Sequence, residues 1–84
     1  MDKIEHIRLA VQDINRSNEI FNSLFNKPQY KLEDVLSEGV TTSFFQVGPN
    51  KLELLEATNE DSPIAKFIAR KGEGIHHIAF AVSD

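Results

Sequence analysis

The 84 residues suffice for one small domain, and their charge limits what that domain binds. Thirteen acidic against nine basic residues give a net charge of −4, which argues against a nucleic-acid partner because such partners need a basic face. No apolar stretch approaches the length of a membrane span, the charged N-terminus lacks a signal-peptide core, and the absence of Cys excludes disulfides and thiolate ligands. We therefore expect a cytoplasmic globular protein with no membrane partner.

The first 57 residues predict a β-α-β-β-β unit. Residues 3–11 alternate as a strand, with one face formed by Ile7, Leu9 and Val11 and the other by Ile4, His6, Arg8 and Ala10. Asp13 or Asn15 can cap the helix that follows, and Asn26-Lys27-Pro28 ends it. The apolar residues of this helix that recur at helical spacing are Ile14, Ile20, Phe21, Leu24 and Phe25.

Three further strands are expected over residues 30–36, 40–47 and 51–57. Turns at Ser37-Glu38-Gly39 and Gly48-Pro49-Asn50 separate them. A short connecting helix is expected within residues 61–72, with Ser62 as its N-cap and Pro63 at its first position. It leads into a last strand over residues 75–82, so that the chain is of the α+β class.

The last predicted strand repeats the first. The run His6-Ile7-Arg8-Leu9-Ala10-Val11 matches His77-Ile78-Ala79-Phe80-Ala81-Val82, and Asp13 matches Asp84, at one constant offset (77 − 6 = 71; 84 − 13 = 71). A constant offset over so many positions indicates an internal repeat. We expect one complete module over residues 1–57 and the first strand of a second, which makes the domain C-terminally incomplete.

The repeat also locates the candidate metal-binding residues. The first helix needs the apolar sheet face, which leaves His6, Thr42 and Glu53 on the uncovered face. The repeat puts His77 on strand five where His6 lies on strand one, and two imidazoles with a carboxylate suit a divalent transition metal. By strand alternation His76 points to the other face, and Arg8 is expected to be solvated.

Four stretches carry a family resemblance. These are Ile4-Glu5-His6-Ile7 with Ala10-Val11, the run Lys51-Leu52-Glu53-Leu54-Leu55-Glu56, the run 61–67 that begins Asp61-Ser62-Pro63, and the run 72–80 that contains His76-His77. Together they cover essentially the whole sequence. The sequence resembles the methylmalonyl-CoA epimerase family of the vicinal-oxygen-chelate superfamily, which includes glyoxalase I.

The resemblance implies a fold, a metal site and a reaction. The fold is two paired β-α-β-β-β modules around a metal held by His6, Glu53 and His77, with the ion expected to be Co, Mn, Ni or Zn. The fourth ligand and an acid–base group fall on a glutamate of the second module's last strand, so no catalytic residue is assigned within the 84 residues. The reaction is epimerisation at carbon 2 of methylmalonyl-CoA, an acyl-CoA substrate, through a metal-stabilised enolate.

Three alternatives stay open at this point. Glyoxalase I uses the same ligands on glutathione hemithioacetals, and two His with one Glu also form the facial triad of non-haem iron dioxygenases. A metal-free ligand-binding module of the same fold is the non-enzymatic alternative.

The last strand also predicts assembly. It exposes unpaired backbone groups together with Ile78, Phe80 and Val82, and such an edge pairs readily with another chain. A homodimer or a swapped assembly is therefore expected.

Overall fold

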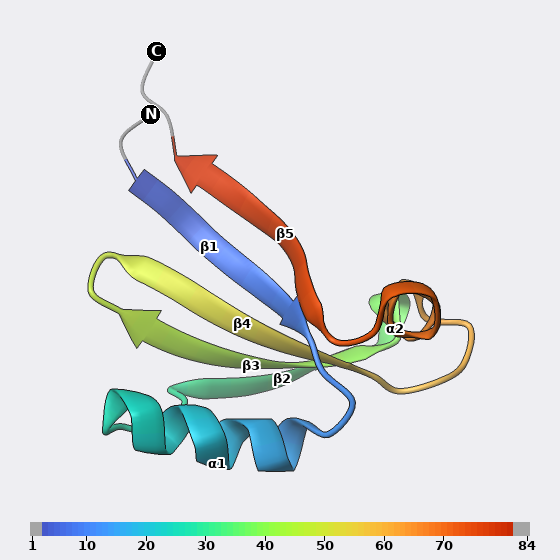
Figure 1. Cartoon of the computed structure of the whole chain (residues 1–84), viewed down its shortest axis with the longest axis horizontal. Helices are drawn as coiled ribbons and strands as arrows, with labels where there is room; N and C mark the ends of the chain where they lie inside the picture. Colours follow the sequence, from blue (N-terminus) through green and yellow to red (C-terminus); the bar gives the residue numbers. More distant parts are fainter. Residues whose placement is uncertain (1–2, 82–84) are drawn as a thin grey trace.

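The computed structural model describes residues 3–81, in which one five-stranded sheet carries a helix on each face (Figure 1). The elements in chain order are β1 (Lys3–Ala10), α1 (Ile14–Phe25), β2 (Lys31–Val35), the 3₁₀ turn η1 (Leu36–Glu38), β3 (Val40–Val47), β4 (Asn50–Ala57), α2 (Pro63–Lys71) and β5 (Gly74–Ala81). The predicted α+β class and order of elements are confirmed, with ends that move by a residue or two.

Strand β1 lies between β4 and β5 in the sheet order β2-β3-β4-β1-β5. It runs parallel to β4, with Ile7 level with Leu52, and antiparallel to β5, with Ile7 level with Ile78. Since Ile78 is the repeat equivalent of Ile7, the two repeated strands pair with each other about that point. Val82 and Asp84, which complete the predicted repeat, lie outside the described residues.

Helix α1 covers one face of the sheet, but with a different stripe from the predicted one. Asp13 caps it by accepting a hydrogen bond from the Arg16 backbone N–H, and Ile14, Phe21 and Phe25 pack on the sheet as expected. The prediction was wrong for Ile20 and Leu24, which are 55% and 68% exposed. A helical residue four positions after Ile14 faces the sheet, and that residue is Asn18, only 6% exposed.

The buried Asn18 side chain has a hydrogen-bond partner in the sheet, and this bond offsets the loss of its contact with water. Its side-chain oxygen accepts a 2.6 Å hydrogen bond from the hydroxyl of Ser43, which is itself fully buried on β3. A buried polar pair of this kind is stable only while both members are present. It therefore fixes the position of α1 along the sheet.

Helix α2 packs on the opposite face, at the end of the sheet where β1 stops. Its Ile64, Phe67 and Ile68 join a second apolar cluster with Ala10 and Leu55. The face predicted to be uncovered is therefore covered at this end, whereas His6, further along it, stays partly exposed. Ser62 caps α2 by accepting from the Ile64 N–H, as predicted.

Gly39 makes room for this second helix. Its φ of +64° lies in the left-handed region, and a Cβ there would come within 3.0 Å of the Asn59 amide and 3.2 Å of the Ser62 Cβ. A side chain at this position would thus strain the backbone and push the α2 N-terminus away from the sheet.

Strand β5 forms one edge of the described sheet. Ile75, Ile78 and Phe80 are all exposed on it, which agrees with the predicted apolar edge for the residues that the structure describes. Neither helix within residues 3–81 has the length and apolar character needed to cross a bilayer.

The Asn18–Ser43 pair gives a test of the packing of α1. We expect Ser43→Ala to lower the free energy of unfolding by about 1–3 kcal/mol, because it leaves the buried Asn18 oxygen without a donor. The double variant Asn18→Leu/Ser43→Ala removes both polar groups and should recover much of that loss. Urea denaturation followed by circular dichroism measures both, and a double variant as unstable as the sum of its single changes would contradict this account.

Candidate metal and substrate site

The two repeat-related histidines meet on the open face of the sheet. In the β1–β5 register His6 is level with Ala79, and His77 is level with Arg8, so the two imidazoles are diagonal neighbours on adjacent strands. Their Nε2 atoms lie 3.1 Å apart, and the rings meet edge to face. The structure therefore brings together the two histidines that the sequence repeat singled out.

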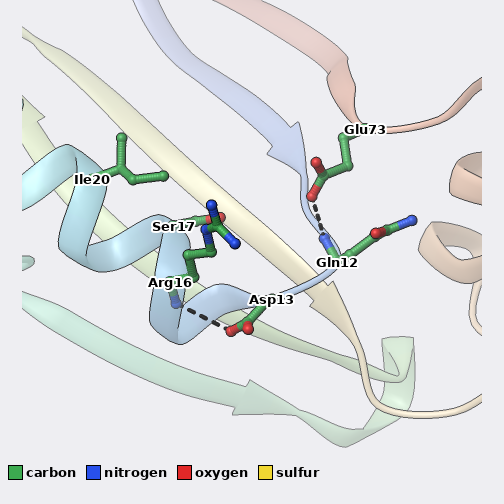
Figure 2. A pocket seen from close by; sticks show the side chains of 6 residues that line it. All are labelled: Gln12, Asp13, Arg16, Ser17, Ile20 and Glu73. Atoms are coloured by element: carbon green, nitrogen blue, oxygen red, sulfur yellow. Dashed lines mark hydrogen bonds between the residues drawn. The ribbon is translucent and has the colours of Figure 1, made fainter.

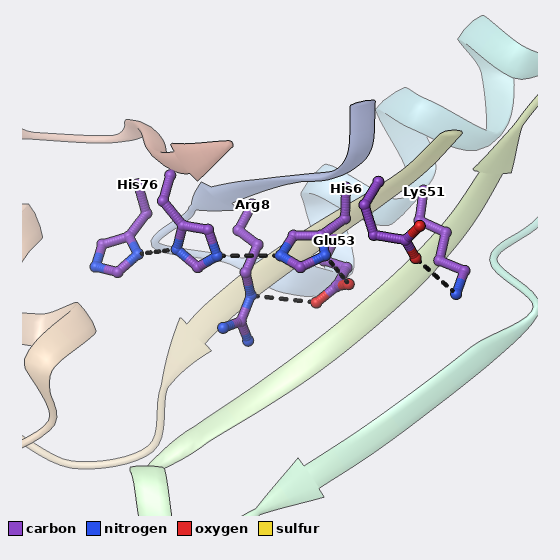
Figure 3. Close-up of polar contacts among 7 residues, drawn as sticks. His6, Arg8, Lys51, Glu53 and His76 are labelled. Carbon is purple, nitrogen blue, oxygen red and sulfur yellow. Dashed lines mark hydrogen bonds and ion pairs between the residues drawn. The ribbon is translucent and has the colours of Figure 1, made fainter. Parts of the chain in front are cut away.

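Glu53 joins this pair from the other side of β1. It is level with Arg8 in the parallel β1–β4 register, and it is buried, with 9% of its surface exposed. Its Oε2 lies 3.9 Å from Nδ1 of His6, the ring nitrogen that faces away from His77 (Figure 3). The three predicted residues thus share one face, but the carboxylate lies beside His6 rather than between the two imidazoles.

Arg8 occupies the centre of the row, between Glu53 on β4 and His77 on β5. The expectation of a solvated side chain was wrong, because the side chain is only 21% exposed and its Nε lies 3.1 Å from Oε1 of Glu53. The Nε–H is not aligned for a hydrogen bond, so the contact is an ion pair. Strand alternation placed Arg8 on the correct face but could not reveal its partner on a strand 45 residues away.

The predicted face of His76 was also wrong. In the register Arg8 is level with His77 and Leu9 with Ile75, which leaves His76 as the extra residue of a β-bulge. The bulge breaks the alternation of faces, so His76 lies beside His77 instead of opposite to it, with the two Nδ1 atoms 3.0 Å apart. Its ring packs edge to face on Phe67 of α2, which ties the site to that helix.

His77 is the group whose acidity the surroundings shift. Burial lowers its pKa below the usual value, and the positive charge of Arg8 and the neighbouring imidazoles of His76 and His6 lower it further, while Glu53 acts in the opposite direction. Both ring nitrogens of His77 face another imidazole. A neutral ring satisfies both contacts by donating at one nitrogen and accepting at the other.

The paired imidazoles fit a shared cation. Two nitrogens bound to one ion at about 2.0–2.1 Å lie within about 4.2 Å of each other, and the observed 3.1 Å meets this condition. Among the residues that the structure describes, no three His, Asp or Glu side chains form a ready ligand cluster. The two histidines alone meet the distance condition for a shared ion, and Glu53 lies beside His6 on the neighbouring strand.

Thr42 lies on the same face as predicted, but it is fully buried, beneath α2 rather than at the histidines. It is level with Leu55, a member of the α2 cluster, and only 1% exposed. Its hydroxyl has no hydrogen-bond partner among the described residues. It is too deeply buried to contact a ligand at the histidines.

A separate hollow lies between the start of α1 and the loop before β5. It encloses 370 Å³ and is lined by Gln12, Asp13, Arg16, Ser17, Ile20 and Glu73 (Figure 2). Both carboxylates of its lining already accept a hydrogen bond from the backbone: Glu73 from the Gln12 N–H at 2.7 Å and Asp13 from the Arg16 N–H at 3.1 Å. Because these carboxylates hold the backbone at residues 12 and 16, we take the histidine face as the candidate functional site.

Comparison with known proteins identifies the family to which this chain belongs. Residues 5–84 match the Glyoxalase/Bleomycin resistance protein/Dioxygenase superfamily, and the chain belongs to that family.

Two individual relatives illustrate the similarity within this family. The chain is 38% identical to the uncharacterized protein YqjC of Bacillus subtilis over 95% of the chain and 57% of the relative. It is 31% identical to the ethylmalonyl-CoA/methylmalonyl-CoA epimerase of Cereibacter sphaeroides over 98% of the chain and 62% of that enzyme. The chain thus spans roughly six-tenths of the length of these relatives.

A solved structure shows the same arrangement of elements. A variant of the Streptomyces coelicolor methylmalonyl-CoA epimerase, in complex with 2-nitronate-propionyl-CoA, superimposes with a TM-score of 0.87 at 33% identity. The match covers 98% of this chain and 61% of that one. The predicted vicinal-oxygen-chelate fold and the family resemblance are both confirmed.

The environment of His77 predicts a pH dependence for the metal-free protein. Because its folded pKa lies below the unfolded value of about 6.5, the unfolded state binds more protons between the two values, and the contribution of His77 to stability falls as pH falls through that window. Arg8→Gln should move the His77 pKa upward, which NMR titration of the ring protons measures. Lys66→Gln, a change of the same charge on α2, serves as the control, and equal shifts in the two variants would contradict the role given to Arg8.

Proposed function

We propose that this chain is the metal-binding and substrate-binding module of a methylmalonyl-CoA epimerase. The observation that carries the proposal is the pair of imidazole Nε2 atoms 3.1 Å apart beside a buried carboxylate, in a chain whose relatives include epimerases of this substrate class. Neutral imidazole and carboxylate together suit Co, Mn, Ni or Zn rather than Ca or Mg.

In this proposal His6 and His77 supply nitrogen ligands and Glu53 supplies an oxygen ligand. A divalent ion there would act as a Lewis acid that stabilises negative charge on the thioester oxygen when the proton at carbon 2 leaves. The sheet orients the histidines by their register, and the His76 ring holds that of His77 from the side. Burial and Arg8 lower the pKa of His77, which favours the unprotonated nitrogen that this role requires.

Epimerisation also needs a base on one side of carbon 2 and an acid on the other. We propose that one of them belongs to a second module of the same β-α-β-β-β type, whose first strand is β5. The greater length of the relatives is compatible with this. The substrate would then be enclosed between the open face of this sheet and that module.

Metal binding is the first test. Calorimetric titration of the 84-residue chain with Co²⁺ or Zn²⁺ should give one site, and His77→Ala should weaken it by more than about 100-fold, since even loss of an outer contact of a ligand costs about 10–100-fold. Glu73→Gln, at the separate hollow, should leave the affinity unchanged. Equal affinity in His77→Ala and the unaltered chain would overturn the assignment.

Substrate choice is the second test. The Co²⁺-loaded chain should bind methylmalonyl-CoA and exchange its carbon 2 proton with deuterium oxide about 10²–10⁴-fold more slowly than the Cereibacter epimerase, because one acid–base group is missing. Exchange as fast as in that enzyme would place both groups in this module and refute the second-module proposal. Isomerisation of a glutathione hemithioacetal without binding of methylmalonyl-CoA would instead favour a glyoxalase.

We also propose that the β5 edge pairs with a second copy when no other module covers it. Exposed Ile78 and Phe80 beside unpaired strand edges favour such pairing. Sedimentation at micromolar concentration should show a dimer, and Phe80→Lys should shift it to the monomer. Leu24→Lys, at another exposed apolar position, on α1, is the control, and a monomer before any substitution would refute the pairing.

A further inference from the structure

We infer that Arg8 is a specificity-determining residue of this site, which binds the free carboxylate of a malonyl-type acyl thioester and so separates it from acyl-CoA molecules that lack that group. The inference rests on the proposed function and names the part of the substrate that the chain selects. Two observations support it: the position of Arg8 in the sheet, and the limited contact of its guanidinium with Glu53.

The sheet places Arg8 at the centre of the candidate site. It is level with Glu53 on one neighbouring strand and with His77 on the other. Any ligand that contacts both the histidine pair and the open face of β1 must therefore lie against its side chain. At the repeat-equivalent position on β5 stands Ala79, which cannot play this part.

The guanidinium is only partly engaged. Glu53 approaches its Nε at 3.1 Å and is its sole ion-pair partner among residues 3–81. Figure 3 shows the two terminal nitrogens pointing away from Glu53. An arginine fork can hold one carboxylate at its Nε edge and bind another end-on with its terminal nitrogens, since it carries five N–H donors in one plane.

The carboxylate that Arg8 already contacts does not satisfy it fully. The Nε–H is buried and poorly aligned with its carboxylate neighbour, so the pair is held by charge rather than by a directed hydrogen bond. A partly buried cation of this kind gains from a second anion more than a solvated one does, because little water screens the interaction. A substrate carboxylate meets this need, and the methyl group of a propionyl thioester does not.

The test compares two ligands that differ in that carboxylate. We would measure the dissociation constants of methylmalonyl-CoA and propionyl-CoA for the unaltered chain, Arg8→Gln and Arg8→Lys by calorimetry, with and without added Co²⁺. We expect the preference for methylmalonyl-CoA to fall by about 10–100-fold in Arg8→Gln, as for loss of a charged bidentate contact. Arg8→Lys keeps the positive charge beside Glu53, and hence the fold, but loses the planar guanidinium. Its preference for methylmalonyl-CoA should lie between those of the unaltered chain and Arg8→Gln.

The matched control is Lys51→Gln, which removes one positive charge from the level of His6 on the same face. It should leave the preference unchanged. A structural role for Arg8 would weaken both ligands equally and keep their ratio, and that outcome overturns the inference while the proposed function stands. If the unaltered chain binds both acyl-CoA molecules equally, the site does not select the carboxylate and the inference is overturned. If it binds neither, the proposed function fails, and the inference that rests on it fails as well.

Discussion

The antiparallel pairing of β1 with β5 is the constraint on which the candidate site depends. Because the two strands are repeats of one another and pair with Ile7 level with Ile78, equivalent residues lie symmetrically about that point. A histidine one residue before the centre of each strand is therefore brought to the same face, diagonal to its equivalent. A slip of one residue would move one imidazole to the α1 face and leave the other without a partner.

The helices then determine which part of that face stays open. Helix α1 fills the opposite face through Ile14, Phe21, Phe25 and the Asn18–Ser43 pair. Helix α2 closes the end near Leu55 through its own apolar cluster, and its Phe67 contacts the bulged His76. His6 and His77 lie beside this closed end and are only partly buried, which suits a ligand that must be held but must also enter.

The sequence was sufficient for the elements and for the faces of the strands, but not for contacts that depend on register between distant strands. Alternation alone placed His6, Glu53 and Arg8 together, and the repeat added His77. The bulge at His76 leaves no signal in alternation, because it is defined by the partner strand. The Arg8–Glu53 pair and the buried Asn18 likewise follow from which strand or helix turn lies opposite, and a strong apolar periodicity misled us about Ile20 and Leu24.

Charge gives a reason for an arginine in this place. If neutral imidazoles and one carboxylate held a divalent ion, the ion and its ligands would keep one net positive charge, and Arg8 would raise the total to two. The free carboxylate of a malonyl thioester brings one negative charge, and removal of its carbon 2 proton brings a second. In the proposed reaction the carboxylate charge would be present as soon as the substrate binds, whereas the charge on the thioester oxygen would develop only as the carbon 2 proton moves to the base. Positive groups near that oxygen would therefore stabilise the deprotonated state more than the bound substrate. Without Arg8 one positive charge fewer would face the developing negative charge, and the electrostatic gain on deprotonation would be smaller.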